Sequence, residues 1–393
     1  MRALVISDTH FGAWTGEDLL RHEPYRARLA PHLDGLDEVI VLGDLVDLLF
    51  GRLEEAFDAT RGLLELVREK LQGGRMVFVA GNHDHHLVTA DAERAAERRL
   101  TGEPSGAGSF IEAFLERHLE GVEVDVRYPT YDFGGVLCTH GHYLDPHSRS
   151  SGGTGGRLLA RMLWSIAAGG RNDPRTIDDY ESTTTLLTEA LYTIAQLPHG
   201  CTAQQSVFRA IGRIGRAARA GTLPVRVARR WSPRRAAGAA TADEATASGY
   251  GHAASEAEAR GGIHESPMAG GPGYAAARLV WPSDPREHAL EAFERVVENL
   301  EWDPQADQIV FGHTQQPLAD VCPPGEGRVR YWNSGSWIYE PDVSSPEAYR
   351  RYLENGWPGT AVLIDTEEPA PRLVEMLRDL NPLHGGEGIR RKD

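Results

Sequence analysis

Short runs of apolar residues alternate with longer amphipathic stretches in the first part of the chain. Residues 2–7, 38–42 and 75–80 are rich in Val, Ile and other strand-forming residues, and each run is predicted to be a strand buried on both faces. Between the last two runs, residues 53–71 carry apolar side chains near helical spacing. This alternation predicts an α/β fold with a largely parallel central sheet.

The strand pattern is interrupted once by a long segment of different character. It continues at residues 122–126 and 135–139, stops over residues 150–285, and resumes at residues 307–311. Shorter apolar runs then predict a second sheet of mostly antiparallel strands, at residues 317–321, 329–332, 361–365 and 372–376. The long segment is therefore predicted to be an insertion within one core fold.

The insertion divides into two parts by composition. Residues 150–235 are rich in arginine and contain three predicted helices, near residues 157–168, 180–197 and 204–220. Residues 236–278 consist mainly of Ala, Gly, Ser and Glu. Such a segment buries too little apolar surface to offset the entropy of ordering it, so a flexible loop is predicted there.

The remaining residues form the predicted core and a short tail. Residues 1–149 and 279–380 are assigned to the core, and residues 381–393 are expected to be disordered. A further helix is predicted to begin at the Asp-Pro pair of residues 284–285, an acidic cap followed by proline in the first turn. This helix is expected to end near Glu301.

Composition limits the protein to a few classes. The chain of 393 residues is 41% apolar, which is enough for a sizeable core, and its three cysteines form no CxxC pair. A sparse, odd number of cysteines argues against a disulfide framework and for a reducing compartment. Neither a signal-peptide pattern nor an apolar stretch of membrane-spanning length occurs, so a cytoplasmic location is expected. The sequence predicts no oligomeric state.

Charge is distributed unevenly along the chain. The whole chain carries a net charge of −16, which argues against broad nucleic-acid binding. Residues 149–235, however, contain 14 arginines, no lysine and five acidic residues, a local charge of +9. Solvated helical faces explain such a segment, but three other roles stay open: a substrate-covering cap, a structural or self-association element, and a peripheral membrane contact.

Polar side chains follow the predicted strands at the points where each strand ends. They are the carboxylates, imidazoles and amide of Asp8, His10, Asp44, Asn82, Asp84, His140 and His313. Because ligands bind beyond the carboxyl ends of parallel strands, these side chains are expected to meet at one rim of the sheet. Carboxylate oxygens together with imidazole nitrogens suit a pair of divalent cations, so the sequence predicts a dinuclear metal site.

Five short segments containing these residues occur in a recognisable order. They are Asp8-Thr9-His10, Gly43-Asp44-Leu45-Val46-Asp47, Gly81-Asn82-His83-Asp84, His140 and Gly312-His313-Thr314. Each segment alone is a weak signal, but together they resemble the motifs of the calcineurin-like metallophosphoesterase superfamily. The resemblance covers roughly residues 1–145 and 300–376. It implies a four-layer αββα sandwich, which here carries a mainly helical insertion.

The resemblance implies a metal-binding role for most of these residues. Asp8 and His10 would hold the first metal, and Asp44 would bridge both metals. The other ligands of the second metal would be the side chains of Asn82, His140 and His313. Manganese is expected at both positions, with iron, zinc, cobalt and nickel as alternatives.

The implied activity is that of a metallophosphoesterase, a phosphoric ester hydrolase. A hydroxide bridging the two metals would attack phosphorus in line, and His83 would protonate the leaving oxygen. Asp84 would orient and polarise His83. The substrate would be a small organic phosphate: a phosphodiester, a phosphomonoester or a nucleotide pyrophosphate. The alternatives are a metal-binding scaffold without turnover and a nuclease.

The sequence departs from the superfamily pattern in its last segment. Related enzymes usually carry a second histidine there as a ligand of the first metal, where this chain has Gln315. An amide oxygen is a poorer ligand for a transition metal than imidazole. Three outcomes are open: Gln315 binds weakly, water takes the position, or a neighbour such as His142 or His147 substitutes.

Other polar residues near these segments have more ordinary interpretations. Asp47 is expected to cap the following helix or to orient His10. His142 is expected at a turn or in contact with substrate, and His85 and His86 are expected at the surface.

The arginine-rich part of the insertion suggests one further comparison. Its basic and apolar helices are similar to the helical cap of the UDP-diacylglucosamine hydrolases of the lipid A pathway, which belong to the same superfamily. Those enzymes cleave a pyrophosphate and release a lipid-linked product. The similarity favours a substrate-covering role for residues 150–235.

Overall fold

The computed structural model describes most of the predicted core and part of the insertion. The described residues are 1–90, 109–147, 174–207, 289–303, 305–323, 329–343 and 345–389. The predicted helix near residues 157–168 and the predicted loop at residues 236–278 lie outside this part of the chain. So do residues 208–220, which form most of another predicted helix.

The larger sheet has six strands and contains the N-terminal strand in its interior. Its order is β13-β12-β1-β3-β4-β5. In that order the strands span Arg372–Glu375, Thr360–Asp365, Arg2–Ile6, Glu38–Leu42, Arg75–Val79 and Glu123–Arg127. Strands β1, β3, β4 and β5 are parallel, whereas β12 and β13 pair antiparallel. The predicted, largely parallel central sheet is confirmed.

A second sheet has five strands in the order β6-β7-β8-β10-β9. In that order the strands span Thr130–Phe133, Val136–Thr139, Gln308–Phe311, Arg330–Asn333 and Leu318–Val321. The inner strands β7, β8 and β10 are parallel, and only the outer strands β6 and β9 pair antiparallel.

The prediction of a mostly antiparallel second sheet is wrong in two respects. Its three central strands are parallel, and β12 and β13, which were predicted to belong to it, are part of the larger sheet. Strand β12 lies between β1 and β13 and is mostly buried. An apolar run of this kind shows that a strand is interior, but it does not show which of two sheets the strand joins.

The two sheets pack face to face. Apolar side chains from both of them fill the space between, including Val5 and Ile40 from the larger sheet and Val310 and Trp332 from the second. Apolar residues at alternate positions of the same strands face outward, toward the helices. Both faces of each sheet are therefore buried, as the continuous apolar runs of the sequence predict.

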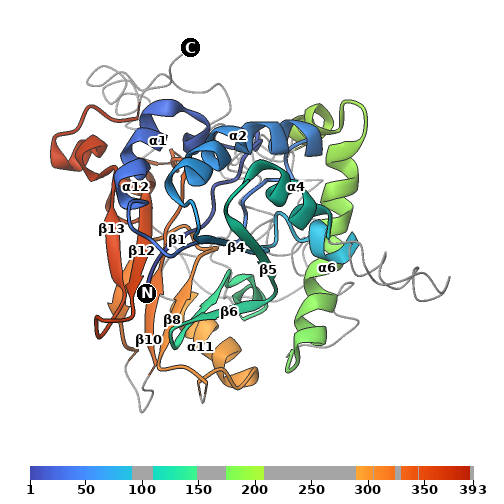
Figure 1. Cartoon of the computed structure of the whole chain (residues 1–393). Helices are drawn as coiled ribbons and strands as arrows, with labels where there is room; N and C mark the ends of the chain where they lie inside the picture. The colour runs from blue at the N-terminus through green and yellow to red at the C-terminus, as the bar shows by residue number, and fades with distance from the viewer. Residues whose placement is uncertain are drawn as a thin grey trace, which may run out of the picture.

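Helices cover the outer face of each sheet. Those on the larger sheet are α1, α2 and α4, which span Glu23–Leu29, Leu53–Lys70 and Phe110–His118. The second sheet is covered by α11, which spans Ala289–Asn299. Figure 1 shows α1, α2 and α4 on one side of the molecule and α11 on the other. Helix, sheet, sheet and helix form the expected four-layer αββα sandwich.

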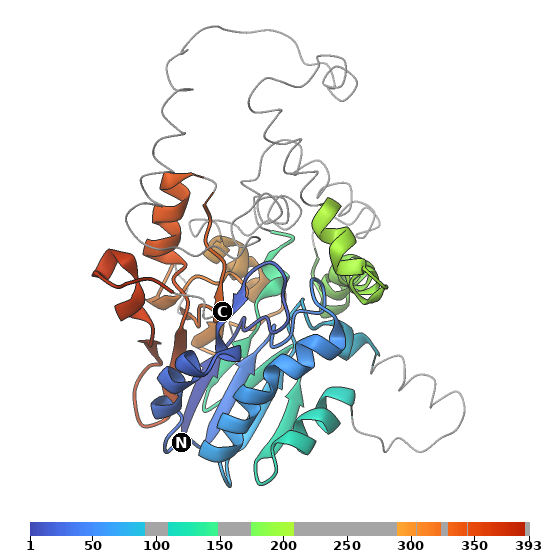
Figure 2. The same ribbon diagram turned by 90° about the horizontal axis from the view of Figure 1, so that it is seen from above.

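The described part of the insertion contains one long helix. It is α6, which spans Ile177–Gln196, close to the helix predicted at residues 180–197. A capping box between Thr176 and Asp179 fixes its start. Figure 2 shows α6 against one side of the core. Among the described residues no helix is long and apolar enough to cross a membrane.

Two helices and part of the C-terminus differ from the prediction. Helix α4 and helix α12 (Pro346–Asn355) were not predicted, although each begins at a serine that caps the first turn. Residues 381–393 were predicted to be disordered, but the first residues of this segment are ordered. Asn381 is buried and donates to Leu353 O at 2.7 Å, and Pro382–His384 form a 3-10 turn.

Candidate metal centre

The side chains predicted to bind metal converge on one edge of the sandwich. They follow β1, β3 and β4 in the larger sheet and β7 and β8 in the second sheet. In the order of those strands they are Asp8 and His10, Asp44, Asn82, His140 and His313. Each side chain is less than 10% exposed. The carboxyl ends of these strands thus deliver buried polar groups to one rim.

The loops that carry these residues are tightly wound. The backbone N–H of Asp8 donates to Gly43 O at 3.1 Å, and that of His10 donates to Asp44 O at 2.9 Å. Asp8, His10, Asp44 and His313 have left-handed φ angles between 47° and 63°. For residues other than glycine such a backbone costs about 1–3 kcal/mol each, and it is typical of functional sites.

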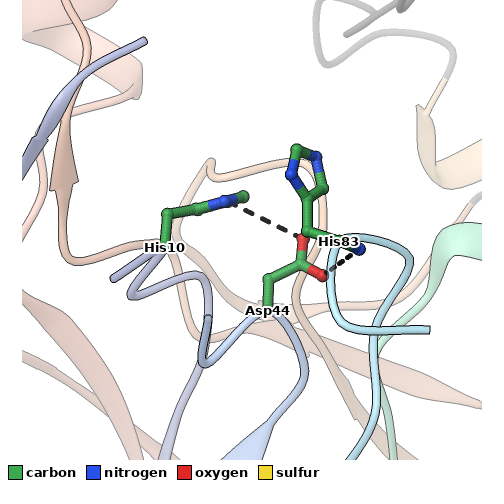
Figure 3. A group of neighbouring side chains, drawn as sticks. All are labelled: His10, Asp44 and His83. Atoms are coloured by element: carbon green, nitrogen blue, oxygen red, sulfur yellow. Dashed lines mark hydrogen bonds and ion pairs between the residues drawn. The ribbon is translucent and has the colours of Figure 1, made fainter. Parts of the chain in front are cut away.

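Asp44 lies at the centre of the site. His10, Asp44 and His83 form one group of candidate metal ligands, and Asp44, His140 and His313 form a second, each with ligand atoms within 4.8 Å of one another. Asp44 Oδ2 is 3.7 Å from His10 Nε2 and 3.2 Å from His140 Nε2. Figure 3 shows the His10 ring directed at the Asp44 carboxylate, with the His83 ring nearby. A carboxylate shared by both groups suits a bridged pair of cations.

Asp8 offers an oxygen without a hydrogen-bond partner. Its Oδ2 accepts from Ser7 Oγ at 2.5 Å and from the backbone N–H of His313 at 3.0 Å. Its Oδ1 is buried, has no hydrogen-bond partner among the described residues and lies 3.7 Å from His10 Nε2. A buried carboxylate oxygen in this state costs free energy, and a coordinated cation would remove that cost.

Two imidazoles are oriented through the nitrogen that faces away from the ligand group. His140 Nδ1 donates to Leu42 O at 2.9 Å, which leaves Nε2 for a metal, 3.2 Å from Asn82 Oδ1. His313 Nε2 lies 2.8 Å from Asp145 Oδ1, which leaves Nδ1 for a metal. Fixing one ring nitrogen in this way sets the tautomer and the direction of the other.

The electrostatics of the site favour positive charge at its centre. Burial alone would lower the pKa of His10, but the surrounding carboxylates raise it well above its usual value. At His140 the charge of Asp44 outweighs burial and raises the pKa to about 9. Burial would raise the pKa of Asp44, but His140 and His83 lower it well below its usual value. Divalent cations would supply this positive charge, so the residues present fit a dinuclear centre.

Asp47 connects the two histidines beside Asp44. Its Oδ2 is 3.0 Å from His83 Nδ1 and 3.2 Å from His10 Nδ1. Its Oδ1 accepts from the backbone N–H groups of Leu49 and Phe50. Asp47 therefore orients His10, which is one of its two expected roles, and it also contacts His83, which was not expected.

Asp84 has a different position from the one expected. Its carboxylate accepts from the backbone N–H of Gly81 at 2.6 Å and of Leu45 at 2.8 Å. Burial and the charge of Asp44 raise its pKa to about 7. The expected pairing of Asp84 with His83 is thus corrected: Asp84 joins two loop backbones, and Asp47 is the carboxylate that contacts His83.

Gln315 reaches the first-metal side of the site. Its Nε2 lies 3.1 Å from His10 Nε2, and its own φ of 55° is also left-handed. The Nε2 atoms of His142 and His147 lie 3.3 and 2.7 Å from tyrosine hydroxyls. Of the three residues considered for the missing ligand, Gln315 is the one that contacts His10.

Asn333 supports the loop that carries His313 and Gln315. Its Nδ2 donates to Gly312 O at 2.8 Å and to Thr314 Oγ1 at 3.1 Å. Its Oδ1 accepts from the backbone N–H of Gly335, so the whole amide is used. Strand β10 therefore braces the end of its parallel neighbour β8 through Asn333.

The insertion contacts the rim of the site through two histidines. His85, which was expected at the surface, is only 2% exposed, and its Nε2 lies 2.6 Å from Glu181 Oε2 on α6. His86 Nδ1 lies 2.8 Å from Glu189 Oε2 on the same helix. The loop after β4 is therefore covered by α6.

One protein-family model matches part of the chain. The family model described as calcineurin-like phosphoesterase matches residues 1–179. The matched segment contains the strands from β1 to β7 with Asp8, His10, Asp44, Asn82 and His140, and it ends within the first turn of α6. No curated protein matches the chain.

Proposed function

We propose that the chain is a calcineurin-like phosphoesterase that hydrolyses a small phosphate ester at a dinuclear metal centre. The observation that carries the proposal is the pair of ligand groups that share Asp44, within a segment that matches this family. Two divalent cations bound there would activate water and offset the charge of the phosphate oxygens. Asp8, His10, Asp44 and Gln315 would hold the first cation. The second would share Asp44 and be held by Asn82, His140 and His313.

His83 is the proposed proton donor to the leaving oxygen. Burial alone would lower its pKa, but the charges of Asp47 and Asp44 raise it, which favours the protonated ring. Its backbone N–H donates to Asp44 Oδ1 at 2.8 Å, and its ring lies edge-on to His10 with the centroids 4.5 Å apart. These contacts at the rim of the ligand groups support the proposed role.

Hydrolysis of bis-p-nitrophenyl phosphate by the purified, Mn²⁺-loaded protein tests the proposal. Asp44→Asn should abolish turnover because it removes the shared ligand. His83→Ala should lower kcat about 10²–10⁴-fold, the usual contribution of general acid catalysis. Asp58→Asn is the matched control, because Asp58 is exposed and pairs with Arg61 on the surface of α2. Absence of turnover with Mn, Fe, Zn, Co and Ni would favour a metal-binding scaffold.

The substrate is proposed only as a chemical class. Phosphodiesters, phosphomonoesters and nucleotide pyrophosphates share the chemistry that this donor set supports, and a nuclease stays the alternative. The comparison with UDP-diacylglucosamine hydrolases, the covering role of the insertion, its membrane contact and a cytoplasmic location all stay predictions. A panel that includes nucleotide sugars and cyclic nucleotides would separate the substrate classes.

A further inference from the structure

Helix α6 of the insertion is packed into the core beside the metal centre. Tyr180 on α6 is fully buried and stacks on Tyr143, with ring centroids 4.9 Å apart. Asn299 of α11 donates to the Tyr180 hydroxyl at 3.2 Å. Figures 1 and 2 both show α6 running along one side of the sandwich. The N-terminal half of this helix is therefore part of the core packing.

Glu181, the next residue of α6, accepts hydrogen bonds from three separate segments. His85 Nε2 lies 2.6 Å from its Oε2, and the hydroxyls of Tyr128 and Tyr143 donate to its Oε1. The side chain is 24% exposed. Burial alone would raise the pKa of Glu181, but hydrogen bonds from His85, Tyr128 and Tyr143 lower it, so the group is a carboxylate.

Two of the three donors lie in segments that carry ligands of the second metal, whereas Tyr128 lies between β5 and β6. His85 is in the loop after β4, three residues beyond Asn82. Tyr143 is in the 3-10 turn His142–Leu144, which begins two residues after His140. Asp145 caps the end of the same turn and contacts His313 at 2.8 Å. Asn82, His140 and His313 are thus each linked to Glu181 through one short segment of chain.

The residues proposed to hold the first metal are held in place by other contacts. His10 is oriented by Asp47, and Asp8 accepts from Ser7 Oγ and from the backbone of His313. Gln315 contacts His10 directly. Apart from the backbone N–H of His313, the supports of the first-metal residues come from parts of the chain other than Glu181 and its donors.

We propose that Glu181 is a positioning residue for the second metal site, so that the insertion completes the metal centre of the core. The proposal rests on the dinuclear centre proposed above. Removing the charge of Glu181 would loosen the segments that carry Asn82, His140 and His313. Residues that hydrogen-bond a metal ligand directly contribute about 10–100-fold to metal affinity, and Glu181, which acts through His85 and Tyr143, is expected at the lower end of that range.

A Mn²⁺ titration followed by EPR tests the proposal without an activity assay. A singly loaded protein gives the hyperfine-split signal of isolated Mn²⁺, and a doubly loaded protein gives the signal of an exchange-coupled pair. The Glu181→Gln variant should need at least about tenfold more Mn²⁺ than the wild-type protein to give the coupled signal. Glu189→Gln should behave as the unchanged protein, because Glu189 lies on the same helix, is 28% exposed and pairs with His86.

Double variants identify the site that is weakened. Adding His10→Ala to Glu181→Gln should remove the EPR signal of the isolated Mn²⁺ that is bound tightly at the first site. Adding Asn82→Ala to Glu181→Gln should leave that signal, because Asn82 belongs to the second site. Equal weakening of both sites, or no change at either, would overturn the proposal. If Glu181→Gln does not fold, Tyr143→Phe removes one of the three hydrogen bonds and should give a smaller shift in the same direction; no shift there would equally overturn it. Two bound Mn²⁺ without phosphoester turnover would contradict the proposed function and leave this inference standing.

Discussion

At the scale of single residues, the centre is built on unusual backbone conformations. Asp8, His10, Asp44, His313 and Gln315 all have left-handed φ angles, a conformation that residues other than glycine seldom adopt. Each costs free energy of the order of 1–3 kcal/mol, which the buried hydrogen bonds around the site must offset. A sequence pattern carries no sign of this, because aspartate and histidine are ordinary residues in many loops.

The substitution Gln315→His should tighten the first metal site. Imidazole is a better transition-metal ligand than an amide, and the side chain at this position already contacts His10 at 3.1 Å. We expect about tenfold higher affinity for the first metal in a Mn²⁺ titration. Gln305→His, at an exposed position, is the control and should change neither site. Unchanged affinity in Gln315→His would show that this position does not coordinate metal.

The positions of the candidate metal ligands were predictable, but their supports were not. Asp8, Asp44 and His140 follow directly from the rule that strand ends point to one rim. That Asp47 rather than Asp84 contacts His83 was not predictable, because both carboxylates lie in loops. Loops have no fixed period, so the direction of a side chain depends on the hydrogen bonds that the loop makes.

At the scale of elements, the turn that follows β3 requires a glycine, because a side chain there would have no room. Gly43 has a φ of 81°, and a Cβ built there would lie 2.2 Å from His140 Nδ1. The turn therefore needs glycine for two reasons: its left-handed backbone and its contact with a metal ligand. No other residue satisfies both.

The substitution Gly43→Ala should weaken metal binding as well as stability. Its matched control is Gly73→Ala, because Gly73 has a similar φ of 78° but nothing within 4 Å of the added Cβ. Both variants should lose about 1–2 kcal/mol from the left-handed backbone. Only Gly43→Ala should also displace His140 and raise the Kd of the second metal. Equal metal affinity in both variants, measured by titration calorimetry, would contradict this account.

The sequence predicted most strands but not all their partners. Every strand of the larger sheet coincides with a predicted apolar run, whereas the placement of β12 beside β1 was missed. Pairing of distant strands depends on tertiary packing, which local apolar patterns do not specify. Helix α4 was overlooked although Ser109 and Glu112 form a readable capping box.

At the scale of the whole molecule, the metal-free protein should lose stability as pH rises. In the folded chain the charge of Asp44 outweighs burial and raises the pKa of His140 to about 9, above its ordinary value of 6.5. The folded state then binds an extra proton, so this contribution to the free energy of unfolding is complete below pH 6.5. It is lost as pH rises through about 9, by roughly 1.4 kcal/mol for each pKa unit.

Urea unfolding of EDTA-treated protein between pH 6.5 and pH 9 would measure this loss. His140→Asn should show a weaker dependence on pH, because the titrating group is absent. With Mn²⁺ bound, the dependence should also weaken, since the cation replaces the proton on His140. A metal-free protein that becomes more stable over this range would contradict the electrostatics described for the site.

The insertion is also packed more closely against the core than its composition predicts. As a separable cap, its removal would change selectivity and spare metal binding. The contacts of Tyr180 and Glu181 instead place the start of α6 within the core, behind the second group of ligands. Buried hydrogen bonds of this kind are not readable from sequence, because Glu181 lies in a helix whose partners are far away in the chain.

Strand β1 pairs with β12, about 360 residues further along the chain. A ribosome adds roughly 5–20 residues per second, so roughly 20–70 s separate the synthesis of the two strands. During that time β1 has β3 on one edge, and its other edge presents unpaired backbone groups beside apolar side chains. Such edges recruit strands from other chains. Neighbouring nascent chains on one messenger are therefore at risk of joining through β1, and slower translation of the C-terminal third would prolong that risk.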